Sequence, residues 1–89
     1  MKTIAAILAR ISLPEINRVT FYKRDEITTD LICCDVEALD QTWTFHEEMM
    51  GWSDLISYLQ SLPDFRSDWY GEVVQSPFAS SEIVAYHRK

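Results

Sequence analysis

The sequence predicts an α+β fold: a mostly antiparallel four-stranded sheet with helices packed on one face and a short helix at the N-terminus. Two periodicities and their order predict it. Apolar residues alternate with polar ones in some segments, as in strands, and recur at three- and four-residue intervals in others, as in amphipathic helices. The resulting order is a helix, a three-strand meander, two helices and a final strand. With 89 residues, the chain is expected to form a single small domain, residues 1–89.

Residues 1–13 are the first expected element, an N-terminal amphipathic helix extension that Pro14 ends. Its apolar residues recur at helical spacing: Ile4, Ile7, Leu8 and Ile11. Lys2 and Arg10 make this helix weakly basic. Docking on a membrane or on a groove of a partner is therefore an alternative to packing against the core.

Three strands are expected next, over residues 17–24, 28–37 and 41–47. The first and third alternate, whereas the second is apolar on both faces at its centre, as a strand in the interior of a sheet is. A turn at Asp25 and Glu26 separates the first two, and a polar turn over residues 38–41 separates the second and third.

Two helices and a strand complete the prediction. Residues 52–62 carry an apolar stripe behind Gly51: Trp52, Leu55, Ile56, Leu59 and Leu62. Pro63 ends that helix, and a second helix over residues 66–75 is expected to end before Pro77. Residues 82–88 alternate again and form the fourth strand. The helices should cover one face of the sheet and leave a face rich in Thr, Tyr and charged residues open.

Charge is segregated along the chain. Residues 25–82 contain thirteen acids and the single base Arg66, whereas residues 1–24 contain five bases and one acid. An acidic body repels phosphate backbones and attracts cationic partners. The basic residues of the first and last strands would pool if those strands were neighbours: Arg18, Lys23, Arg24, Arg88 and Lys89. No nucleic-acid-binding module accompanies them, so no nucleic acid is expected as a partner, and self-association explains the segregation more simply.

Several classes of function lack the residues they need. With only two glycines, the chain can build neither a phosphate-cradling loop nor a dinucleotide-binding fingerprint, so no cofactor is expected. No stretch has the length of a membrane span, and no membrane partner is expected. Cys33 and Cys34 are adjacent and cannot staple distant segments, which favours a cytoplasmic location. Their side chains should point to opposite faces of the central strand as small buried groups.

Candidate site residues cluster after the third strand. His46, Glu47 and Glu48 combine an imidazole with two carboxylates, and His87 is the only further imidazole. Their spacing matches no zinc motif, so no metal is assigned, and a solvated turn whose acids favour the following helix N-terminus is the alternative to acid–base chemistry. Trp43 and Tyr58 are added as binding residues because exposed aromatic side chains anchor interfaces.

The sequence therefore favours a non-enzymatic protein–protein interaction or adaptor domain that binds a basic partner or itself, with a homo-oligomer expected. The acidic surface is expected to carry this binding: Asp35, Glu37, Asp40, Glu47, Glu48, Asp54, Asp64, Asp68 and Glu72. The alternative is a small ligand-binding domain or enzyme. It would use a pocket between sheet and helices near His46, Glu47 and His87.

Overall fold

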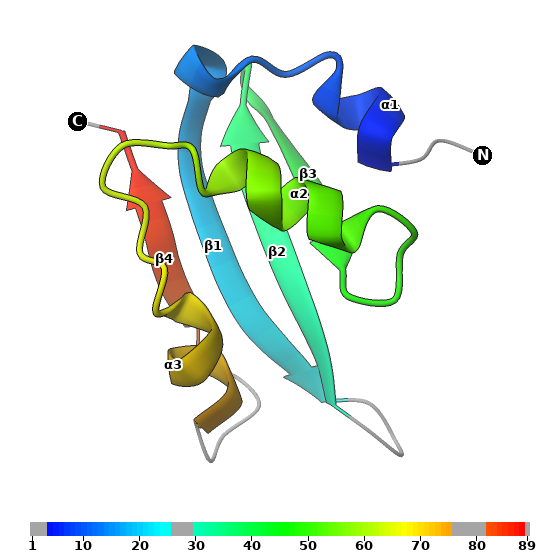
Figure 1. The fold of residues 1–89 in the computed structure, drawn as a ribbon, viewed down its shortest axis with the longest axis vertical. Coiled ribbons are helices and arrows are strands. Elements are labelled where there is room, and N and C mark those ends of the chain that lie inside the picture. Colours follow the sequence, from blue (N-terminus) through cyan, green and yellow to red (C-terminus); the bar gives the residue numbers. More distant parts are fainter. Residues whose placement is uncertain (1–3, 26–29, 76–81, 89) are drawn as a thin grey trace.

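The computed structural model describes residues 4–25, 30–75 and 82–88. Its described elements form two layers, and Figure 1 shows the helices in front of one face of the sheet. In chain order they are α1 (Ile4–Leu8), the 3-10 helix η1 (Leu13–Glu15), β1 (Ile16–Asp25), β2 (Asp30–Ala38), β3 (Gln41–His46), α2 (Trp52–Leu59), α3 (Trp69–Gln75) and β4 (Glu82–His87). The predicted α+β class and the order of its elements are confirmed.

The sheet has the strand order β3-β2-β1-β4, and every neighbouring pair is antiparallel. The first three strands are the predicted meander, and β4 returns to lie beside β1. Cys34 of β2 is paired with Phe21 of β1 on one side and with Phe45 of β3 on the other. Because side chains on paired positions share a face, this row of residues lies on the side that the helices cover.

The connection between β2 and β3 is a tight two-residue turn. Leu39 and Asp40 have φ angles of 54° and 60°, so both occupy the left-handed region, as a type I′ hairpin requires. Neither is glycine, and Leu39 is a poor residue for that region. The predicted polar turn over residues 38–41 is present, but it uses a more strained backbone than its sequence suggests.

Phe21 is the centre of the core. Its ring stacks on that of Trp69, with ring centroids 3.7 Å apart and planes inclined by 11°. Trp52 and Phe65 meet the same ring edge-on, at centroid distances of 6.4 and 6.2 Å. α2, the connection after it and α3 therefore converge on one side chain of β1, which explains how two short helices are held on the sheet.

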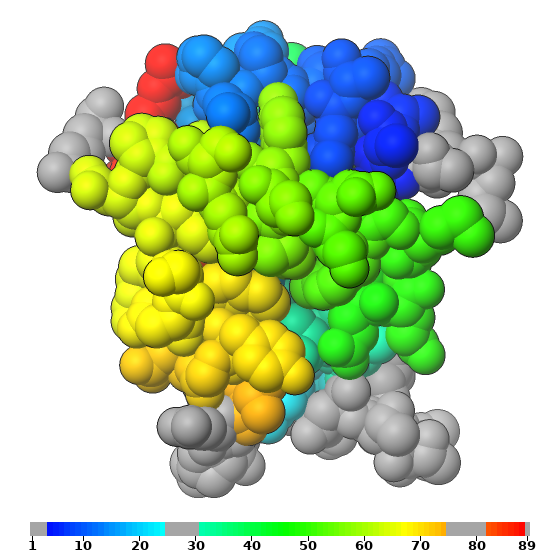
Figure 2. All heavy atoms as spheres, in the orientation of Figure 1, coloured from blue at the N-terminus to red at the C-terminus, as the bar shows by residue number. Residues whose placement is uncertain are grey.

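The expected apolar stripe of the first sheet-covering helix does face the core, since Leu55 and Leu59 are fully buried. Figure 2 shows the helices and their connections as a nearly continuous cover on this side, with strand residues visible beside α3. On the other face of the sheet, Cys33 is fully buried and Leu31 and Thr20 nearly so. No described helix lies over that face, where the described neighbours of these side chains are residues of adjacent strands.

Some helix boundaries differ from the predicted ones. α1 ends at Leu8, α2 ends at Leu59 instead of residue 62, and α3 begins at Trp69 instead of residue 66. Before α3, the backbone N–H of Arg66 donates to the carbonyl of Ala85 on β4 at 2.8 Å, so the residues ahead of the helix are tied to the sheet. The predicted turn at residues 25–26 and the predicted helix end at Pro77 involve residues outside the described ranges.

Candidate functional site

Four of the six candidate residues belong to β3 or to the loop that follows it. Trp43 is half-buried and packs against the core, and His46 is half-buried near the last position of the strand. Glu47 and Glu48 follow and are exposed. Trp43 and His46 lie on opposite faces of the sheet, because Trp43 pairs with Val36 and His46 pairs with Cys33.

Backbone hydrogen bonds hold the beginning of this loop. The N–H of Glu47 donates to the carbonyl of Ile32 at 3.0 Å, and the N–H of Ile32 donates to Glu47 Oε1 at 3.4 Å. The N–H of Met49 then donates to the carbonyl of His46 at 3.0 Å. Glu47 thus extends the ladder of the sheet with its own side chain, and the loop leaves the sheet in a defined direction.

Gly51 directs the loop into α2. Its φ of 97° lies in the left-handed region, and a Cβ at this position would come within 3.2 Å of Ile4 Cβ. A larger residue would therefore meet both backbone strain and α1. The close approach of Gly51 to α1 restricts the position of the loop residues before it, Glu47 to Met50.

We call Glu47, Glu48, Met50 and Asp54 the acidic corner. They come from one loop and the first turn of α2, and Met50 is 85% exposed. Within the described ranges, none of the three carboxylates forms an ion pair, and Asp54 lies where the helix dipole favours a negative charge. The corner thus combines an exposed, flexible apolar side chain with three carboxylates that form no ion pair within the described ranges.

Met50 was missed by the sequence analysis. The sequence does indicate that Met50 could be exposed. It follows Glu47, Glu48 and Met49, directly precedes Gly51, and lies outside the apolar stripe of the following helix. A methionine in such a position can be exposed, and exposed methionines are common at surfaces that bind several partners.

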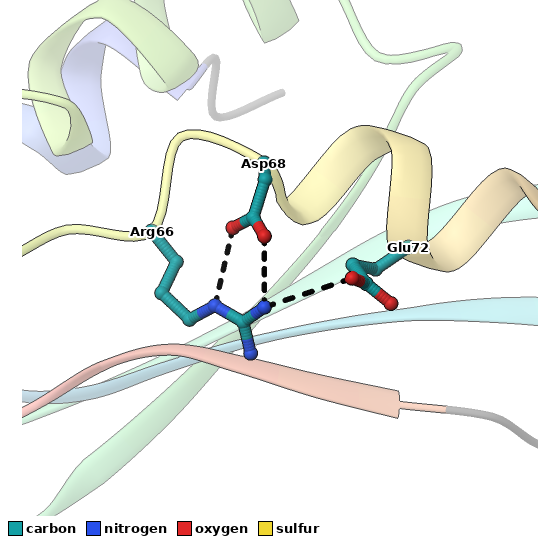
Figure 3. Close-up of polar contacts among 3 residues, drawn as sticks. All are labelled: Arg66, Asp68 and Glu72. Atoms are coloured by element: carbon teal, nitrogen blue, oxygen red, sulfur yellow. Dashed lines mark hydrogen bonds and ion pairs between the residues drawn. The ribbon is translucent and has the colours of Figure 1, made fainter.

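Two acids elsewhere form ion pairs within the protein. Figure 3 shows Arg66 between Asp68 and Glu72: its Nε donates to Asp68 Oδ1 at 3.1 Å, its Nη2 donates to Asp68 Oδ2 at 2.9 Å, and Nη2 lies 3.8 Å from Glu72. The hydrogen bonds with Arg66 lower the pKa of the Asp68 carboxyl. The hydrogen bonds with Asp68 in turn raise the pKa of the Arg66 guanidinium. Two members of the expected acidic surface are therefore already paired.

A polar cluster occupies the open face of the sheet. Asp35 Oδ1 accepts hydrogen bonds from the Tyr22 hydroxyl at 3.2 Å and from Thr44 Oγ1 at 2.8 Å. Burial and, second, the negative charge of Asp35 raise the pKa of Tyr22 to about 12. These bonds join β1, β2 and β3, so Asp35 is held by neighbours and is less available to a partner than the sequence suggests.

Cys33 and His46 are direct cross-strand neighbours on the same open face. Cys33 is fully buried, and His46 Nδ1 is a buried atom with no hydrogen-bond partner. A nucleophilic thiol needs both a base and access for substrate, and this thiol lacks access. Cys34 faces the opposite side, as predicted, where burial raises the pKa of its thiol.

The other two candidate residues lie elsewhere. The Tyr58 hydroxyl donates to the carbonyl of Ile11 at 2.6 Å, so this side chain connects α2 to the segment after α1. His87 lies on β4, whereas His46 lies on β3, at the other border of the sheet. Three strand spacings of about 4.8 Å separate these borders. The structure therefore does not bring His46 and His87 into one pocket.

His87 does border a depression. A cavity of about 260 Å³ is lined by Pro63, Asp64, Tyr86, His87 and Arg88. A second, of about 300 Å³, shares three of these residues and extends to η1. The Arg88 guanidinium donates to Asn17 Oδ1 at 3.2 Å. No described residue here has the arrangement of a nucleophile with an adjacent base, so the depression is a feature of shape without evident chemistry.

The basic residues do not pool into one patch. β1 and β4 are neighbours, but Arg18 lies near one end of β1 and Arg24 near the other. Arg18 Nε also donates to Glu37 Oε2 at 2.6 Å, and this pairing raises the pKa of Arg18. Lys89 lies outside the described ranges.

Comparison with known proteins gave no matching family model, no matching curated protein and no matching solved structure. In residues 4–25, 30–75 and 82–88, no three His, Cys, Asp or Glu side chains are grouped as ligands for a metal ion. No helix in that part of the chain is long and apolar enough to cross a bilayer.

Proposed function

We propose that this protein is a non-enzymatic, cytoplasmic interaction or adaptor domain whose acidic corner docks a basic segment of a partner protein. One observation carries the proposal: Met50 is 85% exposed among carboxylates that have no cationic partner in the described ranges. Methionine is overrepresented at surfaces that bind several partners, and unpaired carboxylates in the same loop attract cationic segments. A partner segment that combines Lys or Arg with a small apolar side chain has the matching chemistry.

Electrostatics gives this docking a specific signature. The protein has a net charge of -6, which speeds the approach of a cationic partner and excludes anionic ones. The three corner carboxylates are exposed, so salt should screen their attraction strongly. Contact of Met50 with an apolar group would add a contribution that salt does not remove.

The test is capture of partners from native cell lysate on immobilised protein, followed by elution with a salt gradient. The double variant Glu48→Gln with Asp54→Asn removes two negative charges at the corner and should lose most of the bound protein. Asp68→Asn with Glu72→Gln is the matched control. It changes the net charge equally, but at carboxylates that already form ion pairs with Arg66. Retention should then stay near the wild-type level.

Three outcomes would contradict the proposal. Capture that resists salt would remove its electrostatic basis. Equal loss in the two double variants would reduce the effect to net charge, and equal retention would place the binding surface away from the corner.

A further inference from the structure

The two border strands of the sheet differ in how their outer edges are treated. β3 and β4 form the two borders in Figure 1. The outer edge of β4 is engaged, because the N–H of Arg66 donates to the carbonyl of Ala85, and its pairing with β1 contains a register shift near Val19 and Thr20. Bulges and covering loops are common ways of blocking an edge. β3 has neither.

The hydrogen-bond ladder fixes which groups of β3 point outward. The bond from Glu47 N–H to the Ile32 carbonyl marks a hydrogen-bonded pair, and such pairs alternate along an antiparallel ladder. Trp43 and Phe45 therefore bond to β2. The backbone groups of Thr42, Thr44 and His46 point away from the sheet.

The outward backbone groups of His46 are already hydrogen-bonded. Its N–H donates to Met49 Sδ at 3.4 Å, and its carbonyl accepts from Met49 N–H. Thr42 and Thr44 are exposed, and no described residue bonds to their outward backbone groups. Within the described part of the chain, the free edge of β3 is thus a short stretch of two N–H and two C=O groups.

The residues of this stretch do not protect it. β3 has the sequence Gln-Thr-Trp-Thr-Phe-His, with no Lys, Glu or Pro. Exposed edges are usually protected by such residues, and an edge without them pairs readily with another strand.

We propose that the occupant is a second copy of this protein, paired antiparallel through β3 about a two-fold axis at Trp43. In this register Thr42 lies opposite Thr44 of the second copy, and each exchanges both backbone hydrogen bonds. The two Trp43 side chains meet directly at a non-hydrogen-bonded pair on the helix side. Thr pairs face each other on the open side, and the two sheets become one of eight strands.

The edge itself favours an identical copy. A two-fold axis makes each contact occur twice, and the outward groups of Thr42 and Thr44 supply equal numbers of donors and acceptors for each other. The neutral strand lets two acidic proteins meet without opposed charges at its centre. The same register sets Asp40 of one copy beside His46 of the other, which pairs a carboxylate with an imidazole that can donate to it.

The interface is small, so the dimer should be weak and concentration-dependent. Stable dimers usually bury about 1,200 Å² or more, and a shared border of four main-chain bonds and one tryptophan pair buries less. Sedimentation velocity of the wild-type protein, from about 10 µM to about 1 mM, should show the mass rising from 10.4 kDa toward twice that value. This rise should persist at about 0.5 M salt, because it depends on backbone bonds.

Two matched variants test the register at low salt. Thr42→Lys with Thr44→Lys puts like charges opposite each other and should weaken association at least tenfold. Thr42→Glu with Thr44→Lys differs only at position 42, but it puts opposite charges across the same interface and should retain dimer formation. Circular dichroism confirms that both variants are folded. Amide exchange at Thr42 and Thr44 should slow as the wild-type concentration rises.

Wild-type protein that stays monomeric to about 1 mM would overturn the proposal. Equal association of the two double variants would overturn it as well, because the interface would then lie elsewhere. The inference is independent of the acidic corner: Glu48→Gln with Asp54→Asn should leave self-association unchanged, so each proposal can fail alone.

Discussion

Cys33 and Cys34 are neighbours on β2, but they belong to the two different faces of the sheet. Cys34 lies on the covered face within the main core. Cys33 lies on the open face, between Tyr22 and His46 of the adjacent strands, outside that core. Both side chains are fully buried. Burial on this protein therefore has two sources, the helical layer on one face and cross-strand packing on the other.

The two faces differ in what stabilises them. The covered face depends on apolar burial around Phe21, in close contact with three other aromatic rings. The open face depends on hydrogen bonds to Asp35 from Tyr22 and Thr44. The first source is large and insensitive to pH, whereas the second is smaller and changes when its groups titrate.

The largest expected effect lies on the covered face. Phe21→Ala should lower the free energy of unfolding by about 3–5 kcal/mol, because it leaves a cavity between Trp69 and Phe65. Thr20→Ala, one residue away on the open face, should cost about 1 kcal/mol or less. Urea unfolding of both variants measures the difference. Similar losses would show that the open face contributes as much as the covered one.

The two cysteines offer a sharper comparison of the faces. Cys34→Ser places a hydroxyl among apolar groups and should cost about 1–3 kcal/mol. Cys33→Ser should cost at least about 1 kcal/mol less, since the carbonyl of Leu31, 3.8 Å from Cys33 Sγ, can accept from a hydroxyl. Thermal or urea unfolding under reducing conditions measures both. Equal costs would mean that the surroundings of Cys33 are as apolar as those of Cys34.

The separation of these faces could be predicted from the sequence, because a strand alternates its side chains with a period of two. The apolar stripe of α2 and the antiparallel meander were predictable for similar local reasons. The start of α3 was not. Arg66 precedes the helix and bonds through its backbone N–H to Ala85, a contact that exists only because β4 lies close by.

The candidate site shows the same limit. The grouping of His46, Glu47 and Glu48 is contiguous in sequence, so it could be read directly. The separation of His46 from His87 follows from strand order, which no local pattern encodes. The difference between the two borders of the sheet is also non-local. It depends on the strand order, which puts β3 and β4 at the borders, and on the backbone bond from Arg66 to Ala85 of β4.

The smallest expected effect belongs to the open face and depends on pH. The pKa of Tyr22 is raised to about 12 in the folded protein, whereas an unfolded tyrosine titrates near 10. Below about pH 10 both states are protonated, and the hydrogen bond to Asp35 contributes its full stability. Between about pH 10 and 12 the unfolded state binds fewer protons, so stability falls as the pH rises.

Tyr22→Phe removes this titration and the hydrogen bond to Asp35. At pH 7 the variant should be less stable than the wild type by about 1 kcal/mol. Its deficit should shrink from about pH 10 upward, because only the wild type loses stability through this group. Urea unfolding of both proteins at neutral and alkaline pH gives the comparison, and a deficit that stayed constant would contradict the raised pKa.

Asp35→Asn separates the two causes of that raised pKa. It leaves the burial of Tyr22 in place but removes the negative charge, and burial is the larger cause. The pKa of Tyr22 should therefore fall only part of the way toward 10, as measured by phenolate absorbance against the Tyr22→Phe background. A complete return to the unfolded value would mean that charge, and not packing on the open face, controls this tyrosine.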